Sequence, residues 1–519
     1  MEYGRVYLIG AGPGEPTLIS VRGLRYLNAA DVVVYDHLVH HRLLRSLRPD
    51  AERIDVGTAS PQPLEQDAIG FLLADKAREG KTVARLKWGD PFIFDSGGTE
   101  ALFLYKQGIP FEVVPGVPPT IAGPCFAGVP LTYPETGDAL VFIRGHDANT
   151  PPDVDWALLA QLRGSIVSYA VGAQLETIID QLLSHGRAAD EPAALIIHGT
   201  LPNQRTIQGT LREIQGVVCE AQHRGSAVLV VGPVVGFREY LRWFDTRPLF
   251  GKRVLVTRAQ DQAADMVDRL LELGADPIEA PTIRIEPPED YGPLDTACAN
   301  VASFDWVVFT SVNGVESFMT RFLDGVRDAR SLSGVRLCAI GPATAGRLAR
   351  YGLRADLVPR EHRGEAVFDA LDHVDGLSGK RVLLPRADLA REVLATALQR
   401  VGADVTEVTA YRTVLAGSDR DRDPDVYKML LEQQVDVVTF TSASTVRNFV
   451  KILGSGPAID LLRTTLVASI GPVTAEAAEQ LGIKTTIMPL TYTIPALVDA
   501  IADHFSDSSG NGSTTGTQT

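Results

Sequence analysis

The chain has 519 residues, of which 45% are hydrophobic and 22% are charged. These fractions are typical of a soluble globular protein and exclude a mainly disordered or collagen-like chain. With 49 basic and 64 acidic residues the formal net charge is −15, which excludes the strong positive field of a general nucleic-acid binder. A small anionic ligand still fits where arginines and helix N-termini lie close together.

At about 150 residues per domain, this length predicts three or four structural units. The four cysteines, Cys125, Cys219, Cys298 and Cys338, are far apart and form no CxxC pair. We therefore expect neither a disulfide framework nor a metal site, and we expect a reducing cytosol as the location. No signal peptide is predicted. The longest uncharged stretch, 113–134, is interrupted by prolines and predicts a buried loop region, not a membrane span.

The first half of the chain alternates short runs of β-type residues with helical segments, which predicts an α/β fold. The predicted strands are 5–10, 31–36, 82–86, 111–116, 139–145, 165–171, 194–199 and 227–232. A second half begins with the β-type run 251–258, so we place a first domain at 1–245 and a linker at 246–251. The Ser/Thr/Gly-rich tail, 506–519, is predicted to be disordered.

The second half, 252–505, contains an internal repeat. RVLVTR recurs as RVLLPR, FTSVNGVESF recurs as FTSASTVRNF, and AIGPATA recurs as SIGPVTA, in the same order. The spacing also matches, because Phe309 lies 32 residues before Gly341 and Phe440 lies 31 residues before Gly471. This repeat predicts two similar α/β lobes with a ligand cleft between them. A duplicated scaffold without chemistry is the alternative.

Side chains at the predicted helix starts of this repeat can bind carboxylates. Each FTS segment and each Gly-Pro turn precedes a helix, where hydroxyl side chains cap the helix and free N–H groups can donate hydrogen bonds to an anion. Arginines just after predicted strands could reach the same cleft. The predicted substrate-binding residues are Thr310, Ser311, Asn313, Thr344, Thr441, Ser442, Ser444, Arg258, Arg386 and Arg412. Ordinary helix capping and surface arginines remain the alternative for any one of them.

The loop GAGPGEP, 10–16, follows a predicted strand, and its glycines first suggest a dinucleotide site. Asp31 and Asp36 even lie at about the expected distance of roughly 20 residues downstream. The glycine spacing does not fit, however, because Pro13 occupies the segment that should open a phosphate-binding helix. An NAD-dependent dehydrogenase is therefore disfavoured.

Longer motifs around this loop indicate a different class of protein. The run VYLIGAGPGEPTLISVRGLRYLNAADVVVYDHLV is followed in order by WGDPFIFDSGG, GIPFEVVPGV, AGVPLT, GTLPNQRTIQGTL and AVLVVGPVV. Through these motifs residues 3–240 resemble the tetrapyrrole methyltransferase family, in particular the uroporphyrinogen-III C-methyltransferases. The resemblance implies a fold of two α/β subdomains with S-adenosylmethionine bound between them, methyl transfer to a pyrrole carbon, and a possible homodimer.

The resemblance also implies the site residues of the first half. The family's donor-binding loops correspond here to Pro13, Trp88, Gly89, Asp90, Ile93, Pro118, Pro119, Ala170 and Gly199. Asp36, at the end of the predicted strand 31–36, matches the family's proposed base. A turn or cap role remains open for Asp90, and a helix-capping role remains open for Asp36.

The first half also departs from the family pattern, which leaves open that it is an inactive scaffold. Trp88 replaces the first residue of a double glycine, Pro118–Pro119 replaces a Thr-Ser or Thr-Ala pair, and Ala170 replaces a methionine. The usual GRGG is here Asp95–Ser96–Gly97–Gly98. Two further pairs differ, Thr58–Ala59 and Tyr133–Pro134.

Residues 251–505 resemble the uroporphyrinogen-III synthases, through FTSVNGV, AIGPATA, Tyr411–Arg412–Thr413, FTSASTV and SIGPVTAEA. The resemblance implies a bilobed α/β fold, with lobe one at 252–282 plus 412–505 and lobe two at 283–411. It implies closure of hydroxymethylbilane with inversion of the last ring, and no cofactor. Tyr411 matches the family's candidate for assisting hydroxyl departure, and Thr474 is a second catalytic candidate. Simple packing at the hinge is the alternative for Tyr411.

Together the two resemblances imply a fused enzyme of tetrapyrrole biosynthesis. One half would make uroporphyrinogen III, and the other would methylate it twice to precorrin-2, toward sirohaem and cobalamin. One alternative is that only the synthase half is active. Another is a bilobed tetrapyrrole sensor without catalysis.

Overall fold

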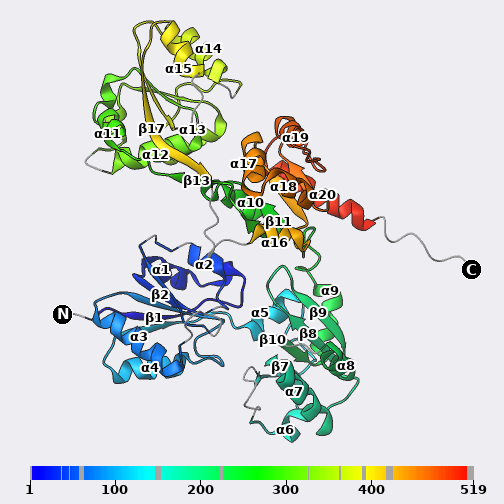
Figure 1. Cartoon of the computed structure of the whole chain (residues 1–519). Coiled ribbons are helices and arrows are strands. Elements are labelled where there is room, and N and C mark those ends of the chain that lie inside the picture. Colours follow the sequence, from blue (N-terminus) through cyan, green and yellow to red (C-terminus); the bar gives the residue numbers. More distant parts are fainter. Residues whose placement is uncertain are drawn as a thin grey trace, which may run out of the picture. The chain divides into compact units, whose positions relative to one another are not determined.

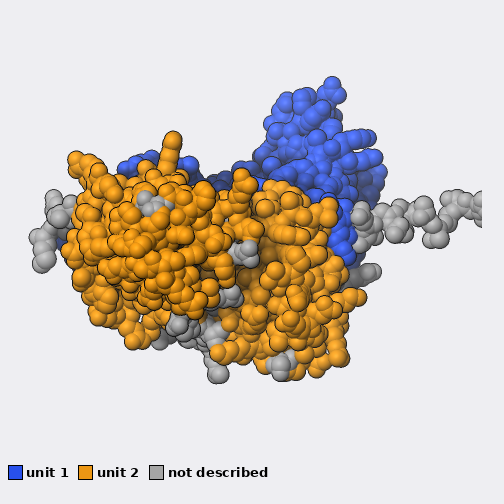
Figure 2. Space-filling view, turned by 90° about the horizontal axis from the view of Figure 1, so that it is seen from above, with its two compact units in different colours: residues 1–253, 270–276, 502–519 blue, residues 254–269, 277–501 orange. Residues whose placement is uncertain are grey.

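The computed structural model describes residues 3–36, 38–45, 47–48, 50–57, 64–145, 153–221, 226–324, 327–361, 364–388, 393–415 and 425–510. The predicted α/β class is confirmed, because strands and helices alternate along the chain (Figure 1). Two compact units are present, a first unit of residues 1–253, 270–276 and 502–519 and a second unit of residues 254–269 and 277–501 (Figure 2). No helix among the described residues is long and apolar enough to cross a membrane.

The first unit begins with a parallel five-stranded sheet. Its order is β3 (Glu52–Asp55), β2 (Val32–Tyr35), β4 (Val83–Lys87), β1 (Val6–Gly10) and β5 (Phe111–Val114). Adjacent residues pack on opposite faces, so Leu8 meets Leu73 on one side and Ile9 meets Leu27 on the other. The helices of this part are α1 (Val21–Ala29), α2 (His41–Arg45), α3 (Gln66–Arg78) and α4 (Gly97–Lys106).

A second, mixed sheet follows in the same unit. Its order is β6 (Ala139–Gly145), β7 (Gly164–Val171), β10 (Ser226–Val231), β8 (Pro192–Ile197) and β9 (Arg205–Thr210). Only β6 and β7 pair in parallel, whereas the other neighbours are antiparallel. The helices here are α5 (Pro119–Phe126), α6 (Trp156–Ala160), α7 (Gly172–Ser184), α8 (Leu211–Ala221) and α9 (Arg238–Leu241).

The eight strands predicted for the first half correspond to β1, β2, β4, β5, β6, β7, β8 and β10. The sequence analysis missed β3 and β9, which are the outer strands of their sheets. Their sequences, ERID and RTIQGT, are polar because an edge strand is only partly covered. The apolar period that reveals a central strand is therefore weak in both.

The second unit contains two further sheets. The first has the order β12 (Asp276–Glu279), β11 (Arg253–Val256), β18 (Val437–Phe440) and β19 (Leu466–Ser469). The second has the order β13 (Ile283–Glu286), β17 (Asp404–Leu415), β16 (Arg381–Ala387), β14 (Trp306–Phe309) and β15 (Arg336–Ala339). The helices are α10 (Gln260–Glu272), α11 (Gly292–Ala299), α12 (Val312–Leu323), α13 (Pro342–Arg350), α14 (Gly364–Asp375), α15 (Val393–Arg400), α16 (Val426–Leu431), α17 (Ala443–Leu453), α18 (Ser455–Leu462), α19 (Pro472–Glu479) and α20 (Ile494–Gly510).

The internal repeat is visible in these elements. Each FTS segment leaves a buried strand, β14 or β18, and opens a helix, α12 or α17. Ser311 and Ser442 are the N-caps, and each side-chain oxygen accepts the N–H of the residue three positions on. Gly341 and Gly471 hold the N-cap positions of α13 and α19, each followed by a proline. Proline is favoured at the first position of a helix, because the N–H group that it lacks would have no partner in the helix there.

Three predicted boundaries differ from the structure. Strand β17 continues to Leu415 and pairs with Ile283 of β13, so Arg412 lies in the second sheet and not in a lobe that resumes there. Leu249, in the predicted linker, is fully buried, and its N–H donates to the carbonyl of Leu273 at 2.9 Å. Helix α20 ends at Gly510, so the start of the predicted tail is helical, whereas 511–519 lie outside the described residues.

Candidate active sites

Three loops of the first unit meet at glycines beyond the ends of β1, β4 and β5. A Cβ atom on Gly116 would lie 2.1 Å from the carbonyl oxygen of Gly89, and one on Gly10 would lie 2.5 Å from the Cα of Gly116. Gly89 also exchanges backbone hydrogen bonds with Gly12 at 2.8 and 3.3 Å. These glycines therefore let the loops pack backbone against backbone. Gly89 lines neither cavity described below, and its predicted contact with the donor stays a prediction.

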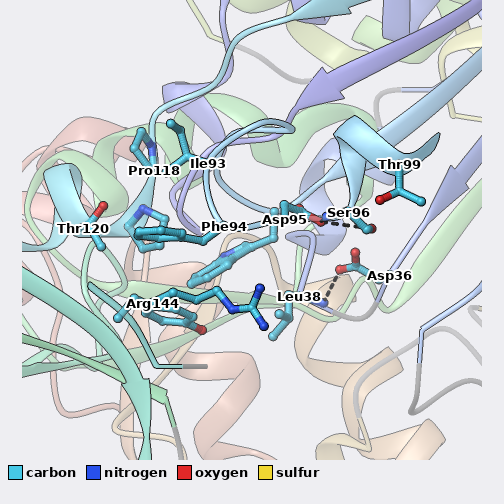
Figure 3. Close-up of a pocket in the computed structure, with 13 residues that line it drawn as sticks. Asp36, Leu38, Ile93, Phe94, Asp95, Ser96, Thr99, Pro118, Thr120 and Arg144 are labelled. Atoms are coloured by element: carbon cyan, nitrogen blue, oxygen red, sulfur yellow. Dashed lines mark hydrogen bonds between the residues drawn. The ribbon is translucent and has the colours of Figure 1, made fainter. Parts of the chain in front are cut away.

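A first cavity of about 730 Å³ opens beside these loops (Figure 3). Such a volume is in the range of small-molecule sites. Both sheets of the first unit contribute to it, since Asp36 follows β2 whereas Arg144 and Tyr169 lie on β6 and β7. The described lining residues are Asp36, Leu38, Trp88, Ile93, Phe94, Asp95, Ser96, Thr99, Pro118, Pro119, Thr120, Arg144 and Tyr169.

Asp36 lines the first cavity directly after the end of β2. Burial raises the pKa of its carboxyl group, and the nearby Arg85 guanidinium opposes part of that rise. One oxygen, Oδ1, accepts the N–H of Leu38 at 3.2 Å, and Oδ2 lies 3.9 Å from Arg85 Nη1. Asp36 thus caps the turn at Leu38, ahead of α2, and also lines the cavity, whereas capping of the next helix, the alternative that the sequence left open, stays a prediction.

A buried network of charges lies next to Asp36. Lys87, only 1% exposed, contacts Glu100 and Asp95 at 2.9 Å each and donates to Ser96 Oγ at 2.7 Å. Arg85 Nε donates to the same Glu100 oxygen at 3.4 Å. Burial alone would raise the pKa of Glu100, but Arg85 and Lys87 outweigh it and lower that pKa. The network fixes the wall that carries Asp95 and Ser96.

Trp88 lies where the first cavity adjoins a second cavity of about 450 Å³. Its Nε1–H donates to the carbonyl of Pro13 at 2.9 Å, and its ring lies 5.0 Å from the ring of Tyr169. The side chain is therefore held at the boundary and leaves space on both sides. The residues described around the second cavity are Pro13, Gly14, Leu38, Val39, His40, His41, Trp88, Pro119, Tyr169, Ile196, His198, Gly199, Leu201, Ala227 and Val228.

Six of the predicted donor-binding residues line these cavities. They are Pro13, Trp88, Ile93, Pro118, Pro119 and Gly199. Asp90 does not, because its oxygens accept the N–H groups of Phe92 and Gly116 at 2.8 and 2.9 Å. The structure thus gives Asp90 the turn role that the sequence had left open.

Ala170 is fully buried in the core beside α7 and lines neither cavity. Its neighbour Tyr169 lines both, because successive side chains of a strand point to opposite faces. The side chain that faces the cavities on β7 is therefore Tyr169, and the predicted donor contact of Ala170 stays a prediction. The sequence analysis missed Arg144 and did not assign a role to Asp95, although the alternation along β6 could have placed Arg144 outside the core.

Tyr411 and Ser311 form a pair in the second unit. Their hydroxyl oxygens lie 2.9 Å apart, and Ser311 Oγ also accepts the N–H of Gly314 at 2.9 Å. Tyr411 lies opposite a register shift between Arg386 and Ala387, at a bulge in the pairing of β16 with β17. Such irregularities re-aim side chains near functional sites.

The other predicted hydroxyl residues gather at the starts of the repeated helices. Ser442 Oγ lies 2.9 Å from Ser444 Oγ and caps Thr445. Thr310 and Thr441 are half-buried just before α12 and α17. Thr344 and Thr474 occupy equivalent positions in α13 and α19 and are 3% and 4% exposed. The predicted catalytic candidate Thr474 is therefore buried, with its N–H donating to the Gly471 carbonyl at 3.1 Å.

The three predicted arginines differ in their partners. Arg386 forms an ion pair with Glu407, and Arg412 pairs with Glu289 at 2.6 Å and Glu286 at 3.2 Å. Carboxylates of the protein thus already neutralise both guanidinium groups, and their role at the substrate stays a prediction. Within the described chain no carboxylate lies within ion-pair distance of Arg258. Burial lowers the pKa of Arg258.

Arg258 is instead linked to the start of α12 through an amide. Arg258 Nε donates to Gln262 Oε1 at 3.2 Å, and Gln262 Nε2 donates to Asn313 Oδ1 at 2.7 Å. This chain joins two predicted binding residues, Arg258 and Asn313, that lie far apart in sequence. The sequence analysis missed Gln262, which no motif singled out.

The fold and the two clusters define an α/β enzyme chain with separate candidate sites in its two units. The family model described as Tetrapyrrole (Corrin/Porphyrin) Methylases matches residues 5–215, and the one described as Uroporphyrinogen-III synthase HemD matches residues 264–499. The chain is 34% identical to the porphyrin biosynthesis protein HemD of Ruminiclostridium josui over 510 residues, which cover 97% of this chain and 98% of that protein. It therefore belongs to the family of fused tetrapyrrole methylases and uroporphyrinogen-III synthases.

The chain is also similar to two methyltransferases. The uroporphyrinogen-III C-methyltransferase of Bacillus subtilis (strain 168) is 35% identical over 380 residues, covering 73% of this chain and 78% of that protein. The solved uroporphyrin-III C-methyl transferase from Thermus thermophilus, complexed with S-adenyl homocysteine, is 35% identical. It covers 45% of this chain and 99% of its own, with a TM-score of 0.39.

Proposed function

We propose that the chain catalyses two consecutive steps. The second unit closes hydroxymethylbilane to uroporphyrinogen III with inversion of the last ring. The first unit then methylates uroporphyrinogen III twice, using S-adenosylmethionine, and releases precorrin-2. The observation that carries the methylation is that Asp36 and six predicted donor-loop residues line two adjoining cavities.

The residues around these cavities fit a sulfonium nucleoside. The second cavity combines the apolar side chains of Ile196, Leu201 and Val228 with the rings of Trp88 and Tyr169. Apolar walls suit a nucleoside base, and aromatic faces attract a cation such as a sulfonium. Trp88 and the twin prolines form walls without closing the space. S-adenosylmethionine supplies the methyl group when it is bound here.

The chain's own contribution to methylation is alignment and removal of a proton. Transfer to a pyrrole carbon needs the reacting groups to be held in line more than it needs acid catalysis. Methylation leaves a cationic intermediate whose methylated carbon is fully substituted, so a proton must later leave a different position of the ring system, and Asp36 is a carboxylate on the cavity that can accept it. Burial makes Asp36 a stronger base than an exposed aspartate, because it raises the pKa of the carboxyl group.

For ring closure, Tyr411 assists departure of the substrate's hydroxyl group. Its phenol is held by Ser311 and lies near the start of α12, where free N–H groups favour anions. Arg258 binds a carboxylate of the bilane, because it lacks a carboxylate partner among the described residues. The rest of the task is to hold a reactive, flexible substrate folded.

One incubation tests the proposal. The full chain is mixed with hydroxymethylbilane and S-adenosylmethionine carrying a labelled methyl group, and the products are identified by mass spectrometry. We expect doubly labelled precorrin-2 from the unmodified chain. Asp36→Asn should stop at uroporphyrinogen III, whereas Tyr411→Phe should slow its formation. Only unlabelled uroporphyrinogen III from the unmodified chain would leave the first unit as a scaffold, and no ring closure would overturn the synthase assignment.

We also propose that the chain works in the cytosol and forms a homodimer through its first unit. The wide spacing of the cysteines and the family resemblance support this proposal. Sedimentation of the full chain and of residues 1–253 in reducing buffer tests the second part. A monomer at micromolar concentration in both would contradict it.

A further inference from the structure

We propose that Arg144 binds a carboxylate of the tetrapyrrole in the first cavity and thereby orients the substrate for methylation. The inference deepens the proposed function and rests on it. It starts from the charges that line the cavity. Two of the described lining residues are acidic, Asp36 and Asp95, and Arg144 is the only cation among them.

A substrate with a carboxylate on every side chain is repelled by the acidic residues that line this cavity, Asp36 and Asp95. Arg85 and Lys87 offset part of that repulsion from behind the wall, and the repulsion that remains costs more where solvent is partly excluded. Binding therefore needs a compensating cation on the cavity wall. An arginine is suited to this task because its planar guanidinium can donate two parallel hydrogen bonds to one carboxylate.

The neighbouring cations are not available for this role. Lys87 is 1% exposed and is held by Asp95, Glu100 and Ser96. Arg85 is 3% exposed and is directed toward Glu100 and the carbonyl of Leu86. Both stabilise the acidic wall from behind, so neither can reach a ligand without breaking a buried ion pair, which is strongly unfavourable.

Arg144 differs from them in exposure and in origin. Its side chain is exposed, and it lies on β6 of the second sheet, whereas Asp36, Asp95 and Ser96 lie in segments that follow strands β2 and β4 of the first sheet. Figure 3 shows its guanidinium reaching across the cavity toward Leu38. The acidic and basic groups thus face one space from different sheets. A substrate carboxylate held by Arg144 leaves the ring to extend toward the Asp36 side.

The test measures methylation of supplied uroporphyrinogen III by the full chain, so that the second unit takes no part. Arg144→Gln removes the charge, Arg144→Lys keeps the charge without the paired donors, and Arg205→Gln is the matched control. Arg205 is an exposed arginine on β9 of the same sheet and lines neither cavity. Affinity for S-adenosylhomocysteine is measured in parallel by calorimetry.

We expect Arg144→Gln to raise KM for uroporphyrinogen about tenfold with kcat nearly unchanged, because the lost interaction is made equally in ground and transition states. The KM of Arg144→Lys should lie between those of Arg144→Gln and the unmodified chain, and the KM of Arg205→Gln should equal that of the unmodified chain. Added salt should raise KM less steeply in Arg144→Gln, since one charge interaction is missing. Affinity for S-adenosylhomocysteine should stay within twofold throughout.

An unchanged KM in Arg144→Gln, with the unmodified chain active, overturns the inference and leaves the proposed function intact. The inference is also overturned if Arg144→Gln raises KM for uroporphyrinogen and weakens S-adenosylhomocysteine binding by the same factor, because Arg144 would then act on the donor. If the unmodified chain does not methylate uroporphyrinogen at all, the proposed function itself fails. Equal KM effects in Arg205→Gln would show that only overall charge matters, which also overturns the inference.

Discussion

The hydroxyl of Tyr411 lies 2.9 Å from the hydroxyl of Ser311, although the two residues are 100 positions apart in sequence. Ser311 is itself fixed as the N-cap of α12, since its Oγ accepts the N–H of Gly314. Burial raises the pKa of the Tyr411 phenol, and its bond to Ser311 partly opposes this rise. Tyr411 therefore stays protonated at neutral pH and can donate a hydrogen bond or a proton.

Replacing Tyr411 by phenylalanine tests this donor role. We expect the rate of uroporphyrinogen III formation to fall at least tenfold, because positioned proton donors contribute about 10²–10⁴-fold where they act alone. The free energy of unfolding should fall by only about 1 kcal/mol, the usual value of one hydrogen bond. Quenched-flow assays and urea unfolding measure the two effects.

The matched control for that variant is Tyr427→Phe, at a tyrosine of the same unit that is 46% exposed. It should leave the rate unchanged. A Tyr411→Phe variant that closes the ring at the unmodified rate would show that Tyr411 only packs at this place.

Asp36→Asn should abolish methylation while leaving uroporphyrinogen III formation intact. The base must be ionised, and burial raises the pKa of Asp36 above its ordinary value. The methylation rate should therefore decline on acidification at a higher pH than an exposed aspartate would give. A pH–rate profile on supplied uroporphyrinogen III checks this, and a profile that is flat from pH 4 to pH 8 would contradict it.

Although Asp36→Asn should abolish methylation, it should raise the free energy of unfolding. A carboxyl group whose folded pKa is raised contributes stability that is present at low pH and is lost as the pH rises through that pKa. Asparagine carries no such loss. Asp36→Asn should therefore gain stability relative to the unmodified chain between pH 4 and pH 7, as measured by urea unfolding of the first unit's transition. A difference that shrinks over this range would show that the Asp36–Arg85 attraction dominates.

Lys87→Met should destabilise the first unit by about 3–5 kcal/mol, because it leaves the buried Glu100 with less positive charge nearby. The control is Lys76→Met, which removes a contact with Glu52 at 2.7 Å where Glu52 is 49% exposed. That pair should be worth less than about 1 kcal/mol. Thermal unfolding of both variants makes the comparison, and equal shifts would show that the buried network adds nothing.

Arg258→Gln should raise KM for hydroxymethylbilane about tenfold or more, since charged hydrogen bonds contribute about 1.5–3 kcal/mol. Arg412→Gln should have a smaller effect, because Glu286 and Glu289 already neutralise that guanidinium. The control is Arg269→Gln. Arg269 lies on α10, the helix that follows Arg258, and pairs with Asp499 at the surface, so its replacement should leave KM unchanged. Steady-state kinetics rank the three, and a larger effect at Arg412 than at Arg258 would reverse the assignment.

Local pattern predicted much of the fold. The central strands β1, β2 and β8 are nearly continuous apolar runs, and such runs indicate burial on both faces without any knowledge of the neighbouring strands. The edge strands β3 and β9 were not predicted, because an edge strand is only partly covered and its apolar pattern is weak. The capping serines Ser311 and Ser442 were predictable too, since a helix start depends on a few adjacent residues.

The sequence by itself thus determined the α/β class, the repeat and the loops that carry the candidate sites. Only the tertiary structure decided how the side chains there are placed: Tyr169 lines both cavities whereas Ala170 is buried in the core, and Arg386 and Arg412 are paired with carboxylates whereas Arg258 is linked to Gln262. The reason is physical. Helix and strand periods act over a few residues, whereas burial, charge pairing and access to a cavity depend on residues that meet only after the sheets have formed.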